Sequence, residues 1–141
     1  MAETPSEFSG HCLCGSVTYR VSAAPAMQGV CHCTDCQRQT GTAFSVVVAV
    51  PRAALTVEGD TLASYTTVGE AHGTPTQRHF CSACGSPIMS LIEALPELAF
   101  IKAGTLDDAA WLEPSVEVWT RSAQPWAPHI EGAMQIERQP G

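Results

Sequence analysis

Seven cysteines in three closely spaced groups constrain this chain of 141 residues more than any other feature of its sequence. Two groups are pairs, Cys12-Leu13-Cys14 and Cys81-Ser82-Ala83-Cys84, and the third is the run Cys31-His32-Cys33-Thr34-Asp35-Cys36. Thiolates at these spacings are typical ligands of a soft metal ion such as Zn²⁺, which normally takes four. A disulfide framework is disfavoured, because C-x-C cysteines pair poorly with each other and an odd total leaves one thiol over.

The ligand count favours two separate metal sites. The two pairs, each followed by a glycine that permits a tight turn, would together form one closed tetrathiolate site. The three cysteines of the run would hold a second ion with one position open for substrate or water. A different partition joins Cys31 and Cys33 to the first pair and leaves Cys36 with the second pair. We prefer the local triad, because closing a short loop costs less entropy than closing long ones.

Composition and charge narrow the class of protein. The length suits one domain with a modest core that metal ions would help to stabilise. The formal net charge is −7 and the seven strong cations are scattered, which argues against a nucleic-acid partner. No apolar run approaches the ~20 residues of a membrane span, and the first ten residues do not read as a signal peptide. With reduced thiols as metal ligands, we expect a cytoplasmic protein.

Short apolar segments broken by eleven glycines and ten prolines predict a mainly β fold with antiparallel strands. The strands are expected at 16–21, 29–31, 44–50, 55–57, 62–65, 77–80, 87–92, 98–102 and 116–119. The apolar segment 44–50 reads as a buried central strand beneath the triad, and 55–57 and 62–65 as a hairpin turning at 58–61. Thr34 or Asp35 is expected to cap a short helix that ends near Gly41.

The cysteine groups sit in longer motifs that resemble a known family. Gly10 to Gly15, Cys31 to Gln37, Phe80 to Pro87, Gly104 to Asp108 and the late Pro125-Trp126, His129 and Gly132 are similar to the glutathione-dependent formaldehyde-activating enzyme (GFA) family, also called the centromere protein V (CENP-V) domain family. The resemblance covers residues 9–133, between an N-terminal tail 1–8 and a C-terminal tail 134–141 whose last residues we expect to be disordered.

The resemblance implies a fold, two zinc ions and an activity. The fold would be the Mss-four-like zinc fold of coiled antiparallel sheets with short helical turns. A structural zinc would be held by Cys12, Cys14, Cys81 and Cys84. A catalytic zinc would be held by Cys31, Cys33 and Cys36. The activity would be that of a carbon–sulfur lyase, which joins the thiol of glutathione to formaldehyde as S-hydroxymethylglutathione or cleaves such an adduct.

Zinc chemistry supports thiol activation in particular. Three thiolates on Zn²⁺ leave a net charge of minus one, which makes the ion a weak Lewis acid toward water or a carbonyl. The same ligand set can lower the pKa of an incoming thiol and keep its sulfur nucleophilic. We therefore expect the substrate thiol to take the open position and attack the aldehyde carbon. Polarisation of the aldehyde oxygen is the competing mechanism.

Residues outside the cysteines are candidates for binding substrate. Glutathione carries carboxylates, so cations and amides near the triad are of interest, namely Gln37, Arg38 and Arg78, with Thr40 and Gln77 as further hydrogen-bond donors. Aromatic side chains could line a pocket over the triad: Phe44, Trp119, Trp126 and His129. Alternation along an extended segment should turn His32 away from the neighbouring cysteines.

Other functions stay open. The zinc ions could be purely structural, in a binding module without catalysis, or the enzyme could act on a different small thiol or carbonyl compound. A redox role lacks a separate resolving cysteine, and a chromosomal role lacks basic or disordered extensions. The expected partners are a small-molecule thiol and an aldehyde, with no nucleic acid and no membrane. A homo-oligomer is left open.

Overall fold

The computed structural model describes residues 3–69 and 73–138. Its strands are β1 (Phe8–His11), β2 (Thr18–Val21), β3 (Met27–Cys31), β4 (Ser45–Pro51), β5 (Leu55–Glu58), β6 (Leu62–Thr67), β7 (Thr76–Cys81), β8 (Pro87–Ile92), β9 (Leu98–Lys102), β10 (Val116–Val118) and β11 (Met134–Gln135). Its helical elements are α1 (Thr34–Thr40) and the 3₁₀ turns η1 (Arg52–Ala54), η2 (Ala103–Thr105) and η3 (Thr120–Ser122). No helix in the described residues is long and apolar enough to cross a bilayer.

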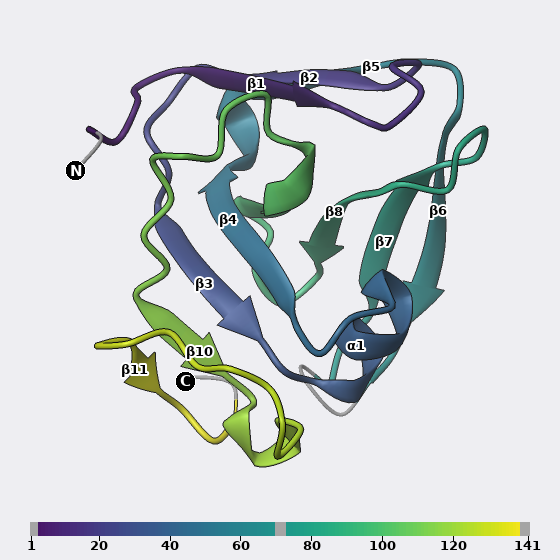
Figure 1. The fold of residues 1–141 in the computed structure, drawn as a ribbon. Coiled ribbons are helices and arrows are strands. Elements are labelled where there is room, and N and C mark those ends of the chain that lie inside the picture. The colour runs from purple at the N-terminus through teal and green to yellow at the C-terminus, as the bar shows by residue number, and fades with distance from the viewer. Residues whose placement is uncertain (1–2, 70–72, 139–141) are drawn as a thin grey trace.

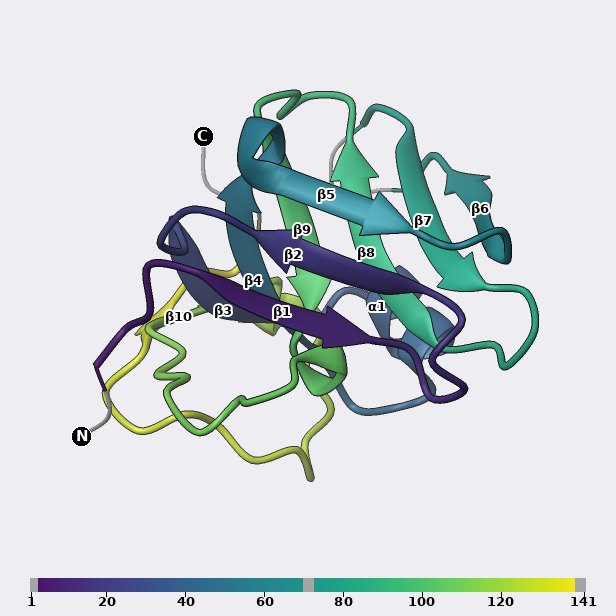
Figure 2. The same cartoon turned by 90° about the horizontal axis from the view of Figure 1, so that it is seen from above.

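The strands form two sheets, which confirms the expected mainly β fold. A three-stranded sheet has the order β1-β2-β5, and an eight-stranded sheet has the order β11-β10-β3-β4-β9-β8-β7-β6. Neighbouring strands are antiparallel, except that β10 runs parallel to both β3 and β11. The small sheet lies across one end of the large one (Figures 1 and 2).

The alternation of side chains along β4 divides the interior into two parts. Val48 and Val50 point into the main core, where they pack with β2 residues such as Tyr19 and Val21 between the two sheets. Val47 and Ala49 point to the opposite face and form a second cluster with Phe100 and Ile92. A continuous valine run is what such a strand requires, because both of its faces are buried.

The helix that contains Cys36, the last cysteine of the triad, begins one residue earlier than expected. Cys33 is the N-cap, and its sulfur accepts a hydrogen bond from the backbone N–H of Cys36 at 3.3 Å. The expectation that Thr34 or Asp35 caps the helix is therefore wrong; Asp35 lies in its first turn. The end is as expected, since Gly41 adopts the left-handed conformation (φ 69°) that glycine tolerates best.

The predicted hairpin at 55–65 is wrong, because its two strands belong to different sheets. β5 pairs with β2, with Val57 opposite Tyr19, whereas β6 pairs with β7, with Leu62 opposite Cys81. Leu55 and Val57 pack against the main core by joining the small sheet, which a local hairpin would not provide. Between the strands, Gly59 has φ 135° and a Cβ there would meet the backbone of Ser16.

Two short strands were not predicted. β1 begins at Phe8, whose ring packs on Trp111 with centroids 5.3 Å apart. β11 takes in the first two residues of the segment 134–141, which was expected to be a tail, and pairs with β10. The end of that segment, 139–141, lies outside the described residues.

Candidate metal centres and active site

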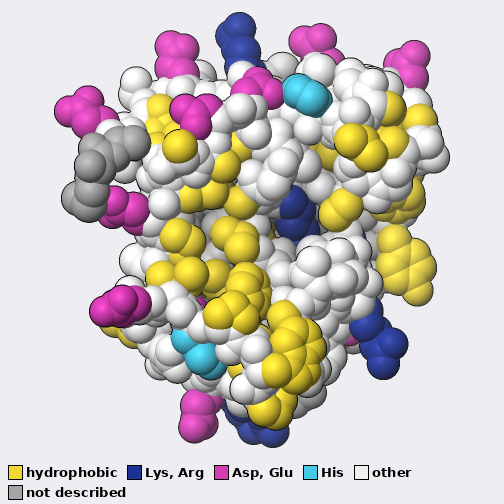
Figure 3. Space-filling model, viewed as in Figure 1, with side chains coloured by type: hydrophobic (Ala, Val, Ile, Leu, Met, Phe, Trp, Pro, Cys, Tyr) yellow, Lys and Arg dark blue, Asp and Glu magenta, His cyan; other side chains and the backbone are white. Residues whose placement is uncertain are grey.

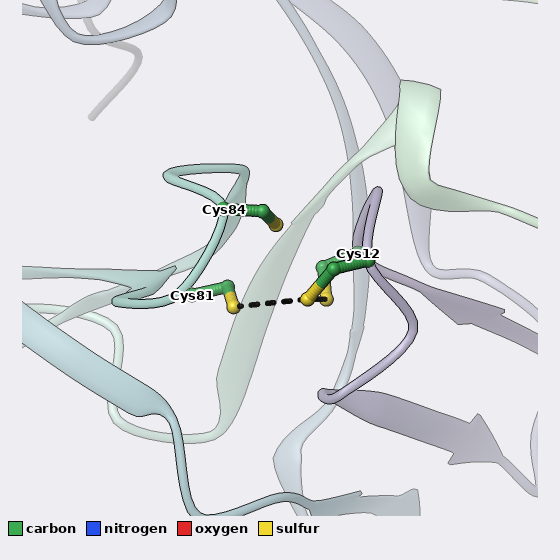
Figure 4. Close-up of side chains that lie close together, drawn as sticks. Cys12, Cys81 and Cys84 are labelled. Carbon is green, nitrogen blue, oxygen red and sulfur yellow. Dashed lines mark hydrogen bonds between the residues drawn. The ribbon is translucent and has the colours of Figure 1, made fainter.

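Four cysteines from two distant turns meet at one point. Cys12 and Cys14 lie between β1 and β2, and Cys81 and Cys84 lie at the turn from β7 to β8 (Figure 4). Their four sulfurs lie within 4.8 Å of one another, with 3.7 Å between Cys12 and Cys14 and 3.8 Å between Cys14 and Cys81. A tetrahedral ion with metal–sulfur bonds of ~2.3 Å has sulfur–sulfur edges of ~3.8 Å. The tetrathiolate cluster could therefore hold a metal ion.

The surroundings of the tetrathiolate cluster favour negative sulfur at two of its cysteines, whereas the pKa of Cys14 is raised. Hydrogen bonds with the hydroxyls of Ser16 and Thr61 lower the pKa of Cys81 to about 5. Hydrogen bonds with Ser86 lower the pKa of Cys84 to about 7. Metal ligation needs the thiolate form, so these contacts suit a metal-binding role.

The other three cysteines form a second cluster at the end of β3 and the start of α1. The sulfurs of Cys31, Cys33 and Cys36 lie within 4.8 Å of one another, and Trp119 and Val118 pack against them. The structure thus groups the sulfurs as we preferred, with Cys31, Cys33 and Cys36 together, and not in the partition that separates Cys36 from Cys31. Three sulfur donors also suit a soft metal ion, so this triad could hold one as well.

Two buried cations lie beside the triad. Arg78, on β7, places Nη1 3.8 Å from the sulfur of Cys36 and is only 5% exposed. Lys102, at the end of β9, is 6% exposed and donates a hydrogen bond from Nζ to Ser45 Oγ at 2.8 Å. Buried charges of this kind need opposite charge nearby, and thiolate sulfur provides it.

The electrostatics of the triad favour one thiolate in particular. Hydrogen bonds with Cys31 and Cys33 lower the pKa of Cys36 well below its usual range, and the charges of Lys102 and Arg78 lower it further. The pKa of Cys31 is raised, because its proton is held in hydrogen bonds with Cys33 and Cys36 and the site is buried. Burial lowers the pKa of Lys102, and the negative sulfur of Cys36 offsets only part of this effect. The negative charge at the triad and the positive charge on Lys102 therefore stabilise each other.

A cavity of about 180 Å³ opens next to the triad. Side chains at alternate positions of six neighbouring strands line it, because those positions share one face of the large sheet. They are Met27, Cys31, Val47, Thr76, Arg78, Ser90, Ile92, Phe100, Lys102, Val116 and Val118, joined by Cys33 and Cys36. On the face seen in Figure 3, hydrophobic side chains gather beside a hollow with Lys or Arg atoms at its base.

A buried carboxylate anchors the triad segment through His32, on the side away from the sulfurs. Glu117, on β10, accepts hydrogen bonds at Oε1 from His32 Nε2 (2.7 Å) and His129 Nδ1 (2.9 Å). Its Oε2 accepts from the backbone N–H of Ile130 at 2.8 Å. Burial works against the negative charge, but these hydrogen bonds hold the pKa of Glu117 below its usual range. His32 is fully buried and points away from the sulfurs, as alternation predicted.

The candidate substrate residues differ in whether they lie at the triad, hydrogen-bond within the protein or face solvent. Arg78 lies at the triad and is buried there. The side chain of Gln37 hydrogen-bonds within the protein. Its Nε2 donates to the carbonyls of His32 (2.7 Å) and Ser122 (3.0 Å), and its Oε1 accepts from Gln124. Arg38 is exposed on α1.

The aromatic candidates also differ in whether they contact the triad. Trp119 packs on Cys33 and Cys36. Phe44 instead packs edge-on against His32, with ring centroids 5.2 Å apart, and Trp126 is 72% exposed; neither lines the cavity. His129 contacts Glu117 rather than the triad.

Three polar residues of the site were missed from the sequence. Lys102 and Ser90 line the cavity, and Glu117 anchors His32. A signal existed for Lys102, since alternation puts it on the same face of its strand as Phe100. For Glu117 there was none, because it lies 85 positions after His32 in the sequence.

The fold and these two clusters define a mainly β protein with two cysteine sites able to hold metal ions. The sequence model of the glutathione-dependent formaldehyde-activating enzyme family matches residues 7–122, and the chain belongs to this family.

Curated relatives agree with this membership. A Penicillium rubens protein named "Putative glutathione-dependent formaldehyde-activating enzyme" is 31% identical over 107 residues, which cover 74% of this chain and 54% of that protein. A Halomonas elongata protein of the same name is 31% identical over 104 residues, covering 70% of this chain and 64% of that protein. The chain thus spans between half and two thirds of the length of these relatives.

A solved structure supports the fold alone. The crystal structure of a Rhodobacter sphaeroides protein superposes with a TM-score of 0.57 at 22% sequence identity, over 75% of this chain and 91% of that one.

Proposed function

We propose that this protein is a zinc-dependent carbon–sulfur lyase that joins a small thiol, such as glutathione, to an aldehyde, such as formaldehyde, or cleaves the adduct. The domain would be residues 9–133, with one structural zinc at Cys12, Cys14, Cys81 and Cys84. A second zinc would lie at the catalytic cysteines Cys31, Cys33 and Cys36. The observation that carries the proposal is the triad with two buried cations at one end of a cavity.

The charges of the site favour an anionic fourth group. With Arg78 and Lys102 protonated, the three thiolates, one Zn²⁺ and the two cations sum to one positive charge. A substrate thiolate is the charge that would neutralise this buried site. Zinc bound at the triad would lower the pKa of that thiol and hold its sulfur as the nucleophile.

The protein's own residues would then act on the aldehyde. As the sulfur bonds to the carbonyl carbon, negative charge develops on the oxygen. Arg78 and Lys102 line the cavity beside the triad and supply positive potential there, which would stabilise that charge. Ser90 Oγ lines the cavity, is buried and has no hydrogen-bond partner among the described residues, so it is available to substrate. Arg38, exposed on α1, is the candidate partner for a glutathione carboxylate outside the cavity.

The test is exchange NMR of glutathione with formaldehyde, with and without the zinc-loaded protein. Acceleration by the native protein and its loss in Cys36→Ser would support the proposal. Thr34→Ala is the matched control, because Thr34 is an exposed neighbour in α1. A fully loaded native protein that does not accelerate exchange would refute glutathione–formaldehyde chemistry and leave a zinc-stabilised binding module or another thiol and carbonyl pair.

All seven cysteines are unpaired in the structure, which suits a reducing compartment, so we place the protein in the cytoplasm. The acidic net charge gives no support to a nucleic-acid partner.

A further inference from the structure

The cavity beside the triad is mostly walled by hydrocarbon. Six apolar side chains from five strands form this wall: Met27, Val47, Ile92, Phe100, Val116 and Val118. Val47, Ile92 and Phe100 are also each at least nine-tenths buried. The wall is therefore the inner surface of a fold, not a chance patch on its outside.

The cavity is large for formaldehyde. An engineered apolar cavity of ~150 Å³ holds benzene, with six carbons, and the volume here is about 180 Å³. Formaldehyde has one carbon, so it would leave most of the wall without a partner. Because the cavity is open, water can enter it, but water gains little beside an apolar wall, so a ligand with an apolar body that covers the wall is favoured.

The charged groups of the cavity lie at the triad, and Ser90 lies opposite Arg78 on the next strand; Thr76, opposite Ile92, is a further polar group of the lining. The triad lies at the cavity together with Arg78 and Lys102. Ser90 is 6% exposed, lines the same cavity, and its Oγ has no hydrogen-bond partner among the described residues. A ligand that suits both the apolar wall and the polar groups at the triad has one oxygen-bearing reactive end and an otherwise apolar body.

We infer that the carbonyl substrate is an apolar aldehyde with a chain or ring of about six carbons, a size set by the benzene comparison. This inference rests on the proposed function and specifies its substrate class. The thiolate sulfur donates an electron pair to the aldehyde carbon, a C–S bond forms, and the carbonyl π pair moves to oxygen. That oxygen then takes the proton that the thiol released, so thiol and aldehyde give a hemithioacetal with no oxidant and no leaving group.

The first experiment compares aldehydes by exchange NMR on the zinc-loaded protein with glutathione. Formaldehyde, acetaldehyde and hexanal are each measured as the ratio of catalysed to uncatalysed exchange. Each buried methylene is worth ~0.8 kcal/mol, or about fourfold in an equilibrium constant. We expect the ratio of catalysed to uncatalysed exchange for hexanal to exceed that for formaldehyde at least tenfold.

A second measurement needs no turnover. 1-Hexanol, which cannot form the adduct, is titrated into protein with ¹³C-labelled methyl groups, and methanol serves as the control ligand. Saturable shifts are expected for the methyls of Val47, Ile92 and Val116 with 1-hexanol and not with methanol.

A pair of variants links binding to selectivity. Val116 lies at the partly exposed edge of the cavity, so Val116→Phe can narrow it without overfilling the core. The variant should lower the hexanal-to-formaldehyde selectivity at least tenfold. Val68→Phe, at a residue that is 68% exposed and away from the cavity, should leave the selectivity unchanged.

The outcomes separate this inference from the proposed function. Catalysis with formaldehyde but not hexanal, and no methyl shifts with 1-hexanol, would overturn the apolar substrate and leave the lyase intact. No catalysis with any aldehyde would overturn the proposed function and this substrate assignment with it. If Val116→Phe does not fold, the hexanal rate and the 1-hexanol titration of the native protein still decide.

Discussion

The buried carboxylate of Glu117 offers the sharpest test of how the triad segment is held. Glu117→Gln keeps the size of the side chain but replaces one acceptor oxygen with an NH₂ group. If the amide oxygen faces His32 and His129, the N–H of Ile130 loses its acceptor; if it faces Ile130, both histidines lose theirs. In either orientation, at least one buried or part-buried donor, His32 or the N–H of Ile130, loses its acceptor.

The expected cost of Glu117→Gln follows from these contacts. A buried donor without a partner costs ~1–3 kcal/mol, and loss of the charge weakens the remaining hydrogen bonds by ~1 kcal/mol. We expect a loss of about 3 kcal/mol in the free energy of unfolding. With a urea m-value of about 2 kcal/mol/M, the midpoint should fall by about 1.5 M.

The assay is urea unfolding near neutral pH with zinc held in fixed excess. Glu113→Gln is the matched control at an exposed site and should change the free energy of unfolding by less than about 0.5 kcal/mol. Equal midpoints for Glu117→Gln and the native protein would refute the reasoning, because the carboxylate would then contribute nothing measurable.

The pH dependence of this effect has a definite sign. The pKa of Glu117 is lower in the folded protein than its ordinary value of 4.5, so folding favours the charged form. Its stabilisation is fully present above that value and is lost as the pH falls through the folded-state pKa. The difference in stability between the native protein and Glu117→Gln should therefore shrink in acid.

Two further predictions concern the rest of the fold. Cys84→Ser should remove one ligand of the tetrathiolate cluster, lower the zinc content measured by atomic absorption, and lower the melting temperature by at least about 10 °C. The exposed neighbour variant Ser82→Ala should do neither. Burial raises the pKa of Tyr19 to about 12, although its hydrogen bond with Thr105 opposes this. The folded protein thus favours neutral Tyr19, so stability should fall as the pH rises from 10 toward 12, and Tyr19→Phe should remove that part of the loss in urea unfolding. An unchanged alkaline slope in Tyr19→Phe would contradict this assignment.

The sequence was informative where chemistry is local. The spacing of Cys31, Cys33 and Cys36 predicted one cluster, because three thiols within six residues can reach one point. The valine run of β4 predicted a strand buried on both faces, and Gly41 predicted the end of α1.

It was less informative where partners are distant. The segments that carry Leu55 and Leu62 are hydrophobic strands with a turn between them, and nothing local shows that they pair with different sheets. The sequence offers Arg78 as a candidate near the triad, but its burial beside Cys36 depends on where β7 lies in the sheet. Trp126 reads as a pocket residue, but its exposure depends on a loop path that no periodicity encodes.

The tetrathiolate cluster also sets an order of events during synthesis. Cys14 and Cys81 lie 67 residues apart, so the first cysteine pair leaves the ribosome well before its partners exist. At ~5–20 residues per second, that wait lasts about 3–13 seconds. Throughout it, Cys12 and Cys14 are unprotected thiols on a nascent chain, open to oxidation or to a wrong metal. The nascent chain is therefore the form in which this cysteine pair lacks the protection that the completed cluster would give.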